Sequence, residues 1–188
     1  GGSEYNETEI NFALASPRPD RVIPDMDFIG HGTAVAGVAA GNGRGSRDRV
    51  YRGAAPEASL IIVRLGRRGQ RSFARTTELM RALKYVVDKA EFLGMPLAVN
   101  ISYGTNDGSH AGNSLFEGYM NDIAQRWKSV IVVASGNEGA AAHHHGGRLT
   151  TNEVRDIDFY TTGGLTSFYL TLWKSFTDIF SVELIMPD

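Results

Sequence analysis

The stretch "SFARTTELMRALKYVVDKAEFLGMPLAVNISYG" (residues 72–104) joins two different hydrophobic periods. Its first part, 72–94, places apolar residues on one helical stripe with charged residues opposite, which predicts an amphipathic helix that Gly94 and Pro96 end. The stripe consists of Leu79, Met80, Leu83, Val86, Val87 and Ala90. Its second part, 97–104, is a short apolar run typical of a strand. A helix followed at once by a strand is the unit from which parallel α/β sheets are built.

The same alternation continues on both sides of this stretch. Upstream, "HGTAVAGVAAG" (31–41) predicts a helix packed closely on a sheet, and "ASLIIVRL" (58–65) predicts a strand buried on both faces. Downstream, "SLFEGYMNDIAQRW" (114–127) predicts a helix and "SVIVVASGN" (129–137) a strand. The expected inward residues of the downstream helix are Leu115, Tyr119, Ile123 and Trp127. We therefore expect an α/β fold, a parallel sheet with helices on both faces.

A different pattern follows Gly139. Three short runs alternate apolar and polar residues, around Ile157, at 168–172 and at 180–186, and turn signals at Gly163-Gly164 and Thr177-Asp178 separate them. This period of two predicts an antiparallel β segment. We place one α/β domain at residues 1–145 and the start of a β domain at 146–188. The chain begins "GGSEYN" and ends "LIMPD", and both ends are expected to be cuts.

Composition excludes several classes of function. The 188 residues carry a formal net charge of −2, so no global field favours nucleic acid or a membrane surface. The absence of cysteine excludes disulfides, thiolate metal sites and a cysteine nucleophile. No apolar run approaches the roughly 18 residues of a membrane span. We expect no nucleic acid, no membrane and no cofactor as partners.

Two charged or titratable clusters are expected to be exposed surface. Nine arginines fall between Arg44 and Arg75, and a solvated face or a surface for an acidic partner is favoured over a nucleic-acid site. The loop 41–53 is basic, so no calcium is expected there. Consecutive residues rarely point at one ion, so the run His143–His145 predicts an exposed loop, and we expect no metal.

Two polar side chains stand where an α/β fold presents catalytic groups. His31 lies between Gly30 and Gly32 at the expected first turn of a helix, whose partial positive charge favours a neutral imidazole that can accept a proton. Asn137 ends the strand 129–137, where its amide can donate a hydrogen bond to a developing oxyanion. Taken alone, His31 would more often be a capping or core residue, and Asn137 would more often belong to an ordinary turn.

A third motif makes the combination specific. The run "NISYG" (100–104) ends a strand whose open edge can pair with an extended peptide. Together with "GHGT" (30–33) and "VASGNEG" (133–139), and in this order, it resembles the subtilisin-like serine proteases, the subtilases. The resemblance covers about residues 27–139.

This resemblance implies roles for individual residues. His31 would be the general base and Asn137 the oxyanion-hole donor of a serine endopeptidase that acts on a polypeptide by acyl transfer. The backbone rails that hold an extended substrate would be formed by Ser102, Tyr103, Gly104, Ser135 and Gly136. Residues 1–145 would then be part of a subtilase catalytic domain.

A narrower likeness rests on two longer runs. The stretch 73–104 and "TSFYLTLWKSFTDIFSVELIMP" (166–187) resemble the clostridial germination-protease (Csp) branch of subtilases. That branch implies a jelly-roll insert before the catalytic serine. It also implies a spore-associated, extracellular or cell-envelope location and a spore-cortex hydrolase proform as substrate. Some of its members are pseudoproteases, so a binding or signalling scaffold is the alternative function.

Two parts of the catalytic triad have no counterpart in the sequence. The family's "D-[ST]-G" and "G-T-S" motifs do not occur, and Asp25 and Asp27 precede His31 too closely to orient it, so we interpret them as variable acidic residues. We therefore expect this chain alone to be inactive. Because the strand that leads to the triad aspartate is central in subtilase sheets, its absence predicts unpaired edges and self-association. A small-molecule-binding α/β domain is disfavoured because no phosphate-binding glycine loop is present.

Overall fold

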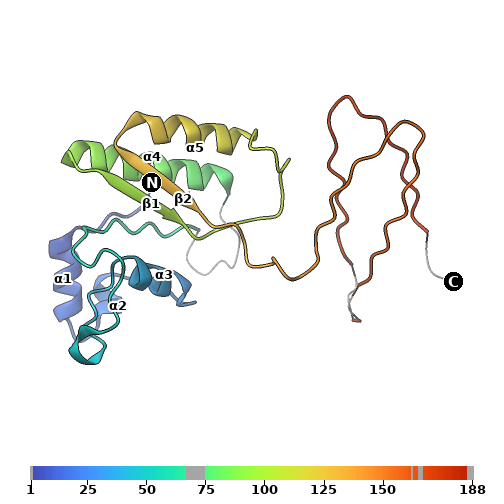
Figure 1. Ribbon diagram of the computed structural model, residues 1–188. Helices are drawn as coiled ribbons and strands as arrows, with labels where there is room; N and C mark the ends of the chain where they lie inside the picture. The colour runs from blue at the N-terminus through green and yellow to red at the C-terminus, as the bar shows by residue number, and fades with distance from the viewer. Residues whose placement is uncertain (1, 67–74, 162, 165–166, 186–188) are drawn as a thin grey trace.

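The computed structural model describes residues 2–66, 75–161, 163–164 and 167–185 (Figure 1). Its elements are α1 (Glu7–Ala15), α2 (Pro19–Val22), α3 (His31–Ala40), a 3-10 turn η1 (Arg47–Arg49), α4 (Thr76–Leu93), β1 (Leu97–Ile101), α5 (Leu115–Arg126) and β2 (Ser129–Val133). The two strands pair in parallel, with Leu97 opposite Ser129 and Ile101 opposite Val133. The predicted α/β class with a parallel sheet is confirmed.

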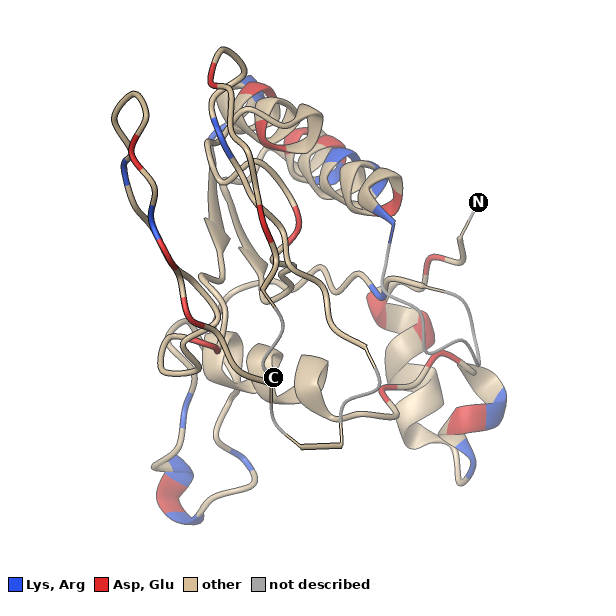
Figure 2. Cartoon of the chain, turned by 90° about the vertical axis from the view of Figure 1, so that its right-hand side faces the viewer, with Lys and Arg blue, Asp and Glu red and all other residues tan. Residues whose placement is uncertain are grey.

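Helix α4 follows its predicted stripe. Five of the six stripe residues are buried, namely Leu79, Leu83, Val86, Val87 and Ala90, and Met80 is half-buried. Gly94 ends the helix in the left-handed conformation with φ of +68°, where a side chain would be strained. Figure 2 shows the charged residues spread along the α4–α5 pair. In the ranges that the structure describes, no helix is both long and apolar enough to cross a membrane.

The core lies between α4, α5 and one face of the sheet. Leu83, Val86, Val87 and Ile123 form its buried centre, and Val99 and the other inward strand residues pack against them. Trp127 is half-buried against this core, and its indole Nε1 donates a hydrogen bond to the Met95 carbonyl at 2.7 Å. This cluster holds β1 and β2 in place, and it therefore also positions the edge of the sheet at which their carboxyl ends lie.

One inward residue of α5 was predicted incorrectly. Leu115 is 90% exposed, and Phe116 packs against the core in its place. Residues 116 and 123 are seven apart and therefore share a helical face, whereas Leu115 is turned about 80° away from Ile123 at 100° per residue. The four-residue spacing from Leu115 to Trp127 drifts around the helix and does not follow one face.

The second face of the sheet is exposed. Helices α4 and α5 lie on the same side of β1 and β2 (Figure 1), and the opposite face carries Ala98, Val130 and Val132, all exposed. In the described ranges, helices therefore cover one face of the two-stranded sheet. Both of its edges lack a strand partner there.

The predicted strand 58–65 is not formed. This segment runs beside the core without a ladder, and Ile61 packs against the core while Leu60 and Ile62 are exposed. A strand is defined by hydrogen bonds to a neighbour, and no described strand lies next to it. The continuous apolar run predicted a strand buried on both faces, but most of these residues are exposed in the structure.

The close packing predicted for α3 is also not observed. None of its residues is buried, and Val38 is 76% exposed. Its last carbonyls instead accept hydrogen bonds from a loop: Ala54 N donates to Val38 O at 3.0 Å and Ala55 N to Ala39 O at 2.8 Å. The covered face of the sheet is occupied by α4 and α5, so α3 is held by this loop.

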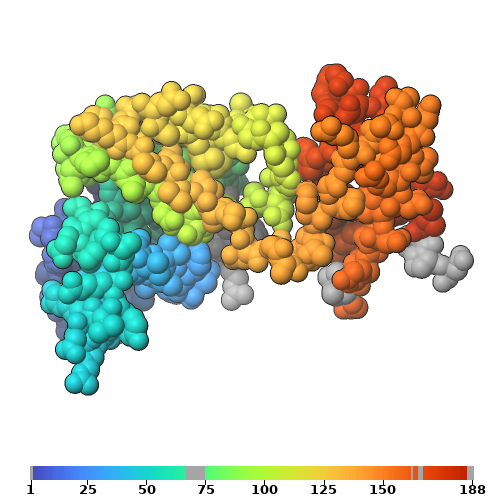
Figure 3. All heavy atoms as spheres, viewed as in Figure 1, coloured from blue at the N-terminus to red at the C-terminus, as the bar shows by residue number. Residues whose placement is uncertain are grey.

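The segment after β2 is extended but unpaired. No strand occurs in the described residues from Ala134 to Ile185, so the predicted antiparallel pairing is not formed. The predicted turns are present, and Asp178 N donates to Ser175 O at 3.1 Å. Most apolar side chains of this segment are exposed, so no second layer holds the runs in register. Figure 3 shows the segment beside the α/β unit; the boundary at 145 stays a prediction.

Candidate active site

His31 is the first residue of α3, as predicted. Gly30 precedes it at φ of +86°, in the left-handed region, and a Cβ added there would meet nothing within 4 Å. The His31 side chain is exposed and makes no hydrogen bond to any described residue. The imidazole therefore projects from an ordered backbone into open space.

Asp27 organises the turn that carries His31. Its Oδ1 accepts from the N–H groups of Ile29 (3.0 Å) and Gly30 (2.8 Å), and its Oδ2 accepts from the N–H and the hydroxyl of Thr33, both at 2.8 Å. These donors, the Thr33 N–H first, hold the pKa of the Asp27 carboxyl well below its usual range. The interpretation of Asp27 as a variable acidic residue missed this role. The available signal was an aspartate two and three residues before N–H groups that open a helix.

The loop before His31 is attached to the 58–65 segment. Arg64 pairs with Asp25 at 3.0 Å, and the Arg64 guanidinium lies 5.8 Å from the centre of the Phe28 ring. Ile61, earlier in the same segment, packs against the core. In Figure 1 the segment passes below β1 toward the carboxyl ends of the strands. These contacts connect the α3 start with the edge of the sheet that parallel strands use for function.

The residues predicted to hold substrate follow two neighbouring strand ends. Ala134 N donates to the Ile101 carbonyl at 3.0 Å, one step beyond the ladder, so Ser102 and Ser135 leave the sheet side by side. Gly104 is exposed, and nothing lies within 4 Å of a Cβ added to it. Gly136 has φ of +97°, a conformation that favours glycine. The structure thus brings both predicted rails to one edge.

Local contacts hold the first of the two backbone rails, residues 102–104. The Ser102 hydroxyl accepts from Asn100 Nδ2 at 2.9 Å, and both Ser102 and Tyr103 are half-buried. Their backbone therefore leaves β1 in a fixed direction, while Gly104 beyond them is open. An extended peptide needs exposed backbone N–H and C=O groups of this kind to add itself as a strand.

Asn137 sits in a bend directly after Gly136. Its side chain is exposed and makes no hydrogen bond within the described part of the chain. The next residue, Glu138, accepts from Asn106 Nδ2 at 2.7 Å and lies 3.3 Å from His143 Nδ1. Asn106, and then His143, lower the pKa of the Glu138 carboxyl.

The Asn106–Glu138 contact joins the loop after β1 to the loop after β2. Sequence reasoning missed both residues, because a contact across 32 positions leaves no local pattern. The contact therefore ties the residue that follows Asn137 to the loop after β1. No hydrogen bond joins His31 and Asn137 in the described residues, and their facing of one cleft stays a prediction.

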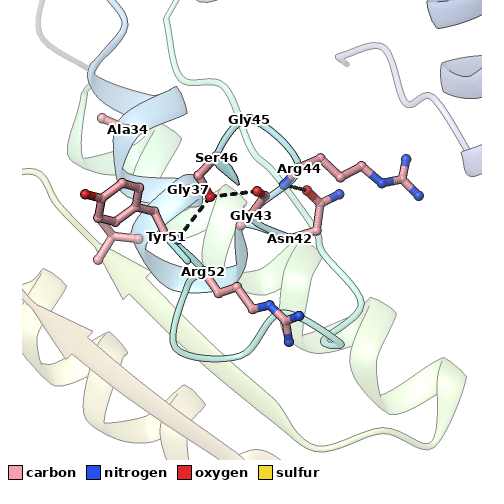
Figure 4. A pocket seen from close by; sticks show the side chains of 11 residues that line it. Ala34, Gly37, Asn42, Gly43, Arg44, Gly45, Ser46, Tyr51 and Arg52 are labelled. Atoms are coloured by element: carbon pink, nitrogen blue, oxygen red, sulfur yellow. Dashed lines mark hydrogen bonds between the residues drawn. The ribbon is translucent and has the colours of Figure 1, made fainter. Parts of the chain in front are cut away.

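A hollow of about 470 Å³ lies beside α3 and the loop that follows it (Figure 4). Ala34, Val38 and Tyr51 supply apolar lining, and Ser46 braces the loop by donating to Gly43 O at 2.9 Å. Arg44 and Arg52 stand at its rim with their guanidinium groups exposed. None of the residues predicted for catalysis lines it. In the residues described, no group of three or more acidic or histidine side chains could hold a metal ion.

Comparison with known proteins gives two findings. The sequence pattern of the subtilase family matches residues 4–160, a range that includes His31 and Asn137. The chain is also similar to the solved structure of the CspB protease of Clostridium perfringens, with 44% sequence identity and a TM-score of 0.71. That similarity covers 78% of this chain and 31% of the CspB chain, so the chain spans about a third of that protein's length.

Proposed function

Because this chain belongs to the subtilase family, we propose that it is part of a longer subtilisin-type serine endopeptidase, with His31 as general base and Asn137 as oxyanion donor. One observation carries the proposal: Ser102 and Ser135 leave adjacent parallel strands, and Asn137 follows two residues later as an exposed amide. His31, exposed at the start of α3, supplies the matching proton acceptor.

The proposed reaction is peptide-bond hydrolysis by acyl transfer. The serine of the longer protein attacks the scissile carbonyl, His31 takes the serine proton, and the Asn137 Nδ2 donates to the oxygen that becomes negative. His31 then gives the proton to the leaving amine, and water releases the acyl group by the same path in reverse. Both the serine and the aspartate that orients His31 would come from outside these 188 residues, which contain neither motif.

The substrate is proposed to bind as an extended strand. The backbone around 102–104 would form one rail and that of 135–136 the other, with the peptide between them. The similarity to the CspB protease agrees with the resemblance to the Csp branch. On that resemblance we propose a role in spore germination, on a polypeptide such as the proform of a spore-cortex hydrolase. The same resemblance implies a spore-associated, extracellular or cell-envelope location.

Labelling of the serine tests this function. The longer protein should react with a fluorophosphonate probe and cleave an extended fluorogenic peptide, whereas the 188-residue chain alone should do neither. Without the nucleophile no acyl-enzyme can form, and His31 and Asn137 cannot replace it. Labelling of the short chain above a His31→Ala control would show that the motifs are wrongly assigned. A folded longer protein that binds polypeptide but neither reacts nor cleaves would favour the scaffold function.

We also propose that this chain by itself self-associates. The exposed face of the sheet carries Val130 and Val132, and Ile62 lies exposed on the adjacent segment. Open strand edges beside an apolar face favour pairing between copies. The weight-average mass in sedimentation velocity should rise with concentration, and Val132→Lys should reduce this rise. Val154→Lys, at a more exposed position outside the sheet, is the control and should leave it unchanged. A monomer at every concentration would contradict the proposal.

A further inference from the structure

The carboxylate of Asp27 forms a bracket around His31. It binds N–H groups on both sides of that residue: Ile29 and Gly30 before it, and Thr33 after it. A fourth donor, the Thr33 hydroxyl, reaches the same Oδ2 atom at 2.8 Å. Every one of these contacts goes to the turn itself, and none goes to the imidazole of His31.

The other contact described at this turn lies before His31, where the Arg64 guanidinium is 5.8 Å from the centre of the Phe28 ring. Gly30 occupies the capping position and has no side chain, so the opening N–H groups of α3 would otherwise be left to water. No residue of α3 is buried, so packing does not fix the first turn either. The negative charge also complements the positive end of the helix dipole. The Asp27 bracket is therefore the main restraint on the backbone that carries His31.

The lowered pKa of the Asp27 carboxyl has a consequence for acidification. A carboxyl whose pKa is lower in the folded state stabilises that state fully above its unfolded pKa, and this stabilisation is lost progressively as the pH falls from the unfolded pKa through the folded pKa. The bracket therefore persists at a pH where ordinary carboxyl groups are already protonated. It is present throughout the neutral range in which a general base works.

We propose that Asp27 is the positioning residue of His31: it fixes the direction in which the imidazole leaves α3 and so sets its distance from the serine of the longer protein. The catalytic part of this inference rests on the proposed function. Asp27 is distinct from the aspartate of a catalytic triad, because it acts on the peptide backbone and not on the imidazole ring.

Catalysis is sensitive to this kind of placement. A displacement of about 1 Å at a catalytic group can cost about 100-fold in rate. We expect Asp27→Ala to lower kcat by about 10- to 100-fold in the longer protein and to leave KM within about 2-fold, since the substrate rails at 102–104 and 135–136 are untouched. Asp27→Asn should fall between wild type and Asp27→Ala, because its Oδ1 still accepts from Ile29 and Gly30 while its amide cannot accept from the Thr33 N–H.

The matched control is Asp20→Ala. Asp20 is another acidic residue upstream of His31, and it pairs with Arg18 at 3.1 Å, away from the turn. Its kcat and KM should equal those of wild type. A loss in Asp20→Ala as large as in Asp27→Ala would overturn the positioning role, and so would an unchanged kcat in Asp27→Ala.

A second measurement needs no turnover and uses the 188-residue chain. Asp27→Ala should speed amide hydrogen exchange at Gly30 and Thr33 on the order of 5-fold, the size of a lost helix cap, and leave Val87 in the core unchanged. The imidazole proton resonances of His31 should shift while those of His110 stay. Unchanged exchange and unchanged His31 resonances would overturn the inference. Absent turnover in the wild-type longer protein, with both NMR changes present, would instead count against the proposed function alone.

Discussion

His31→Ala in the longer protein is expected to lower kcat by about 10⁶-fold, the size of loss that a subtilisin itself shows when its histidine is removed. The physical reason is proton transfer. Without the imidazole the serine hydroxyl keeps its proton and is a weak nucleophile at neutral pH, and the leaving amine has no acid to protonate it. Initial rates with a fluorogenic peptide and the rate of labelling by a fluorophosphonate probe both measure the effect.

The control for this substitution is His144→Ala. His144 lies in the exposed loop after β2, outside the motifs that carry the proposed machinery. It removes the same side chain and should leave kcat unchanged. A His31→Ala protein that keeps more than a hundredth of the wild-type kcat, with its fold intact by circular dichroism, would contradict the assignment of His31 as general base.

Asn137→Ala is expected to lower kcat by about 10²- to 10³-fold, a magnitude that comes from the equivalent asparagine of a subtilisin. The amide stabilises charge that appears only in the transition state, so kcat and kcat/KM should fall equally while KM stays constant. Asn137 is exposed and makes no hydrogen bond to described residues, so its loss should not change the free energy of unfolding.

The matched control here is Asn121→Ala, an exposed asparagine on α5. It should change neither kcat nor KM. A rise in KM with unchanged kcat in Asn137→Ala would show that the amide binds the substrate ground state. That result would contradict the assignment of Asn137 as the oxyanion donor.

Helix α4 and the parallel pairing could be predicted because local patterns encode them. Its six stripe residues repeat at helical spacing over about three turns, and charges fill the opposite face, so only one face can be buried. Helix α5 was predicted with one incorrect residue, since Leu115 and Phe116 are both apolar and only the helical phase separates them. Neither prediction required knowledge of distant parts of the chain.

The segment 58–65 and helix α3 show where such patterns fail. An apolar run such as 58–65 shows what its residues would bury, but it carries no information about whether a neighbouring strand is present to pair with it. Small residues at helical spacing in α3 likewise predict close packing only if a surface is available. The exposed face of the β1–β2 sheet shows that burial depends on partners that a local pattern does not contain.

The residues of the candidate site also differ in how far the sequence predicts them. His31 and the two rails follow from short motifs with glycine at fixed positions, and the structure places each at the end or start of the expected element. Asp27 acts through four hydrogen bonds whose donors depend on the exact path of the turn, and Asn106 reaches Glu138 from another loop. Such restraints come from three-dimensional geometry, so the sequence alone points to candidate reacting groups more readily than to the groups that hold them.

A crystal structure of the longer protein with a phosphonate inhibitor bound to its serine tests the central claim most directly, because the phosphonyl oxygen occupies the place of the oxyanion. We predict that Asn137 Nδ2 lies about 2.7–3.1 Å from that oxygen. His31 Nε2 should lie about 2.6–3.2 Å from the serine Oγ on the same side of the sheet. An oxygen held by other groups while Asn137 points away, or a His31 on the opposite face of the β1–β2 sheet, would contradict the account.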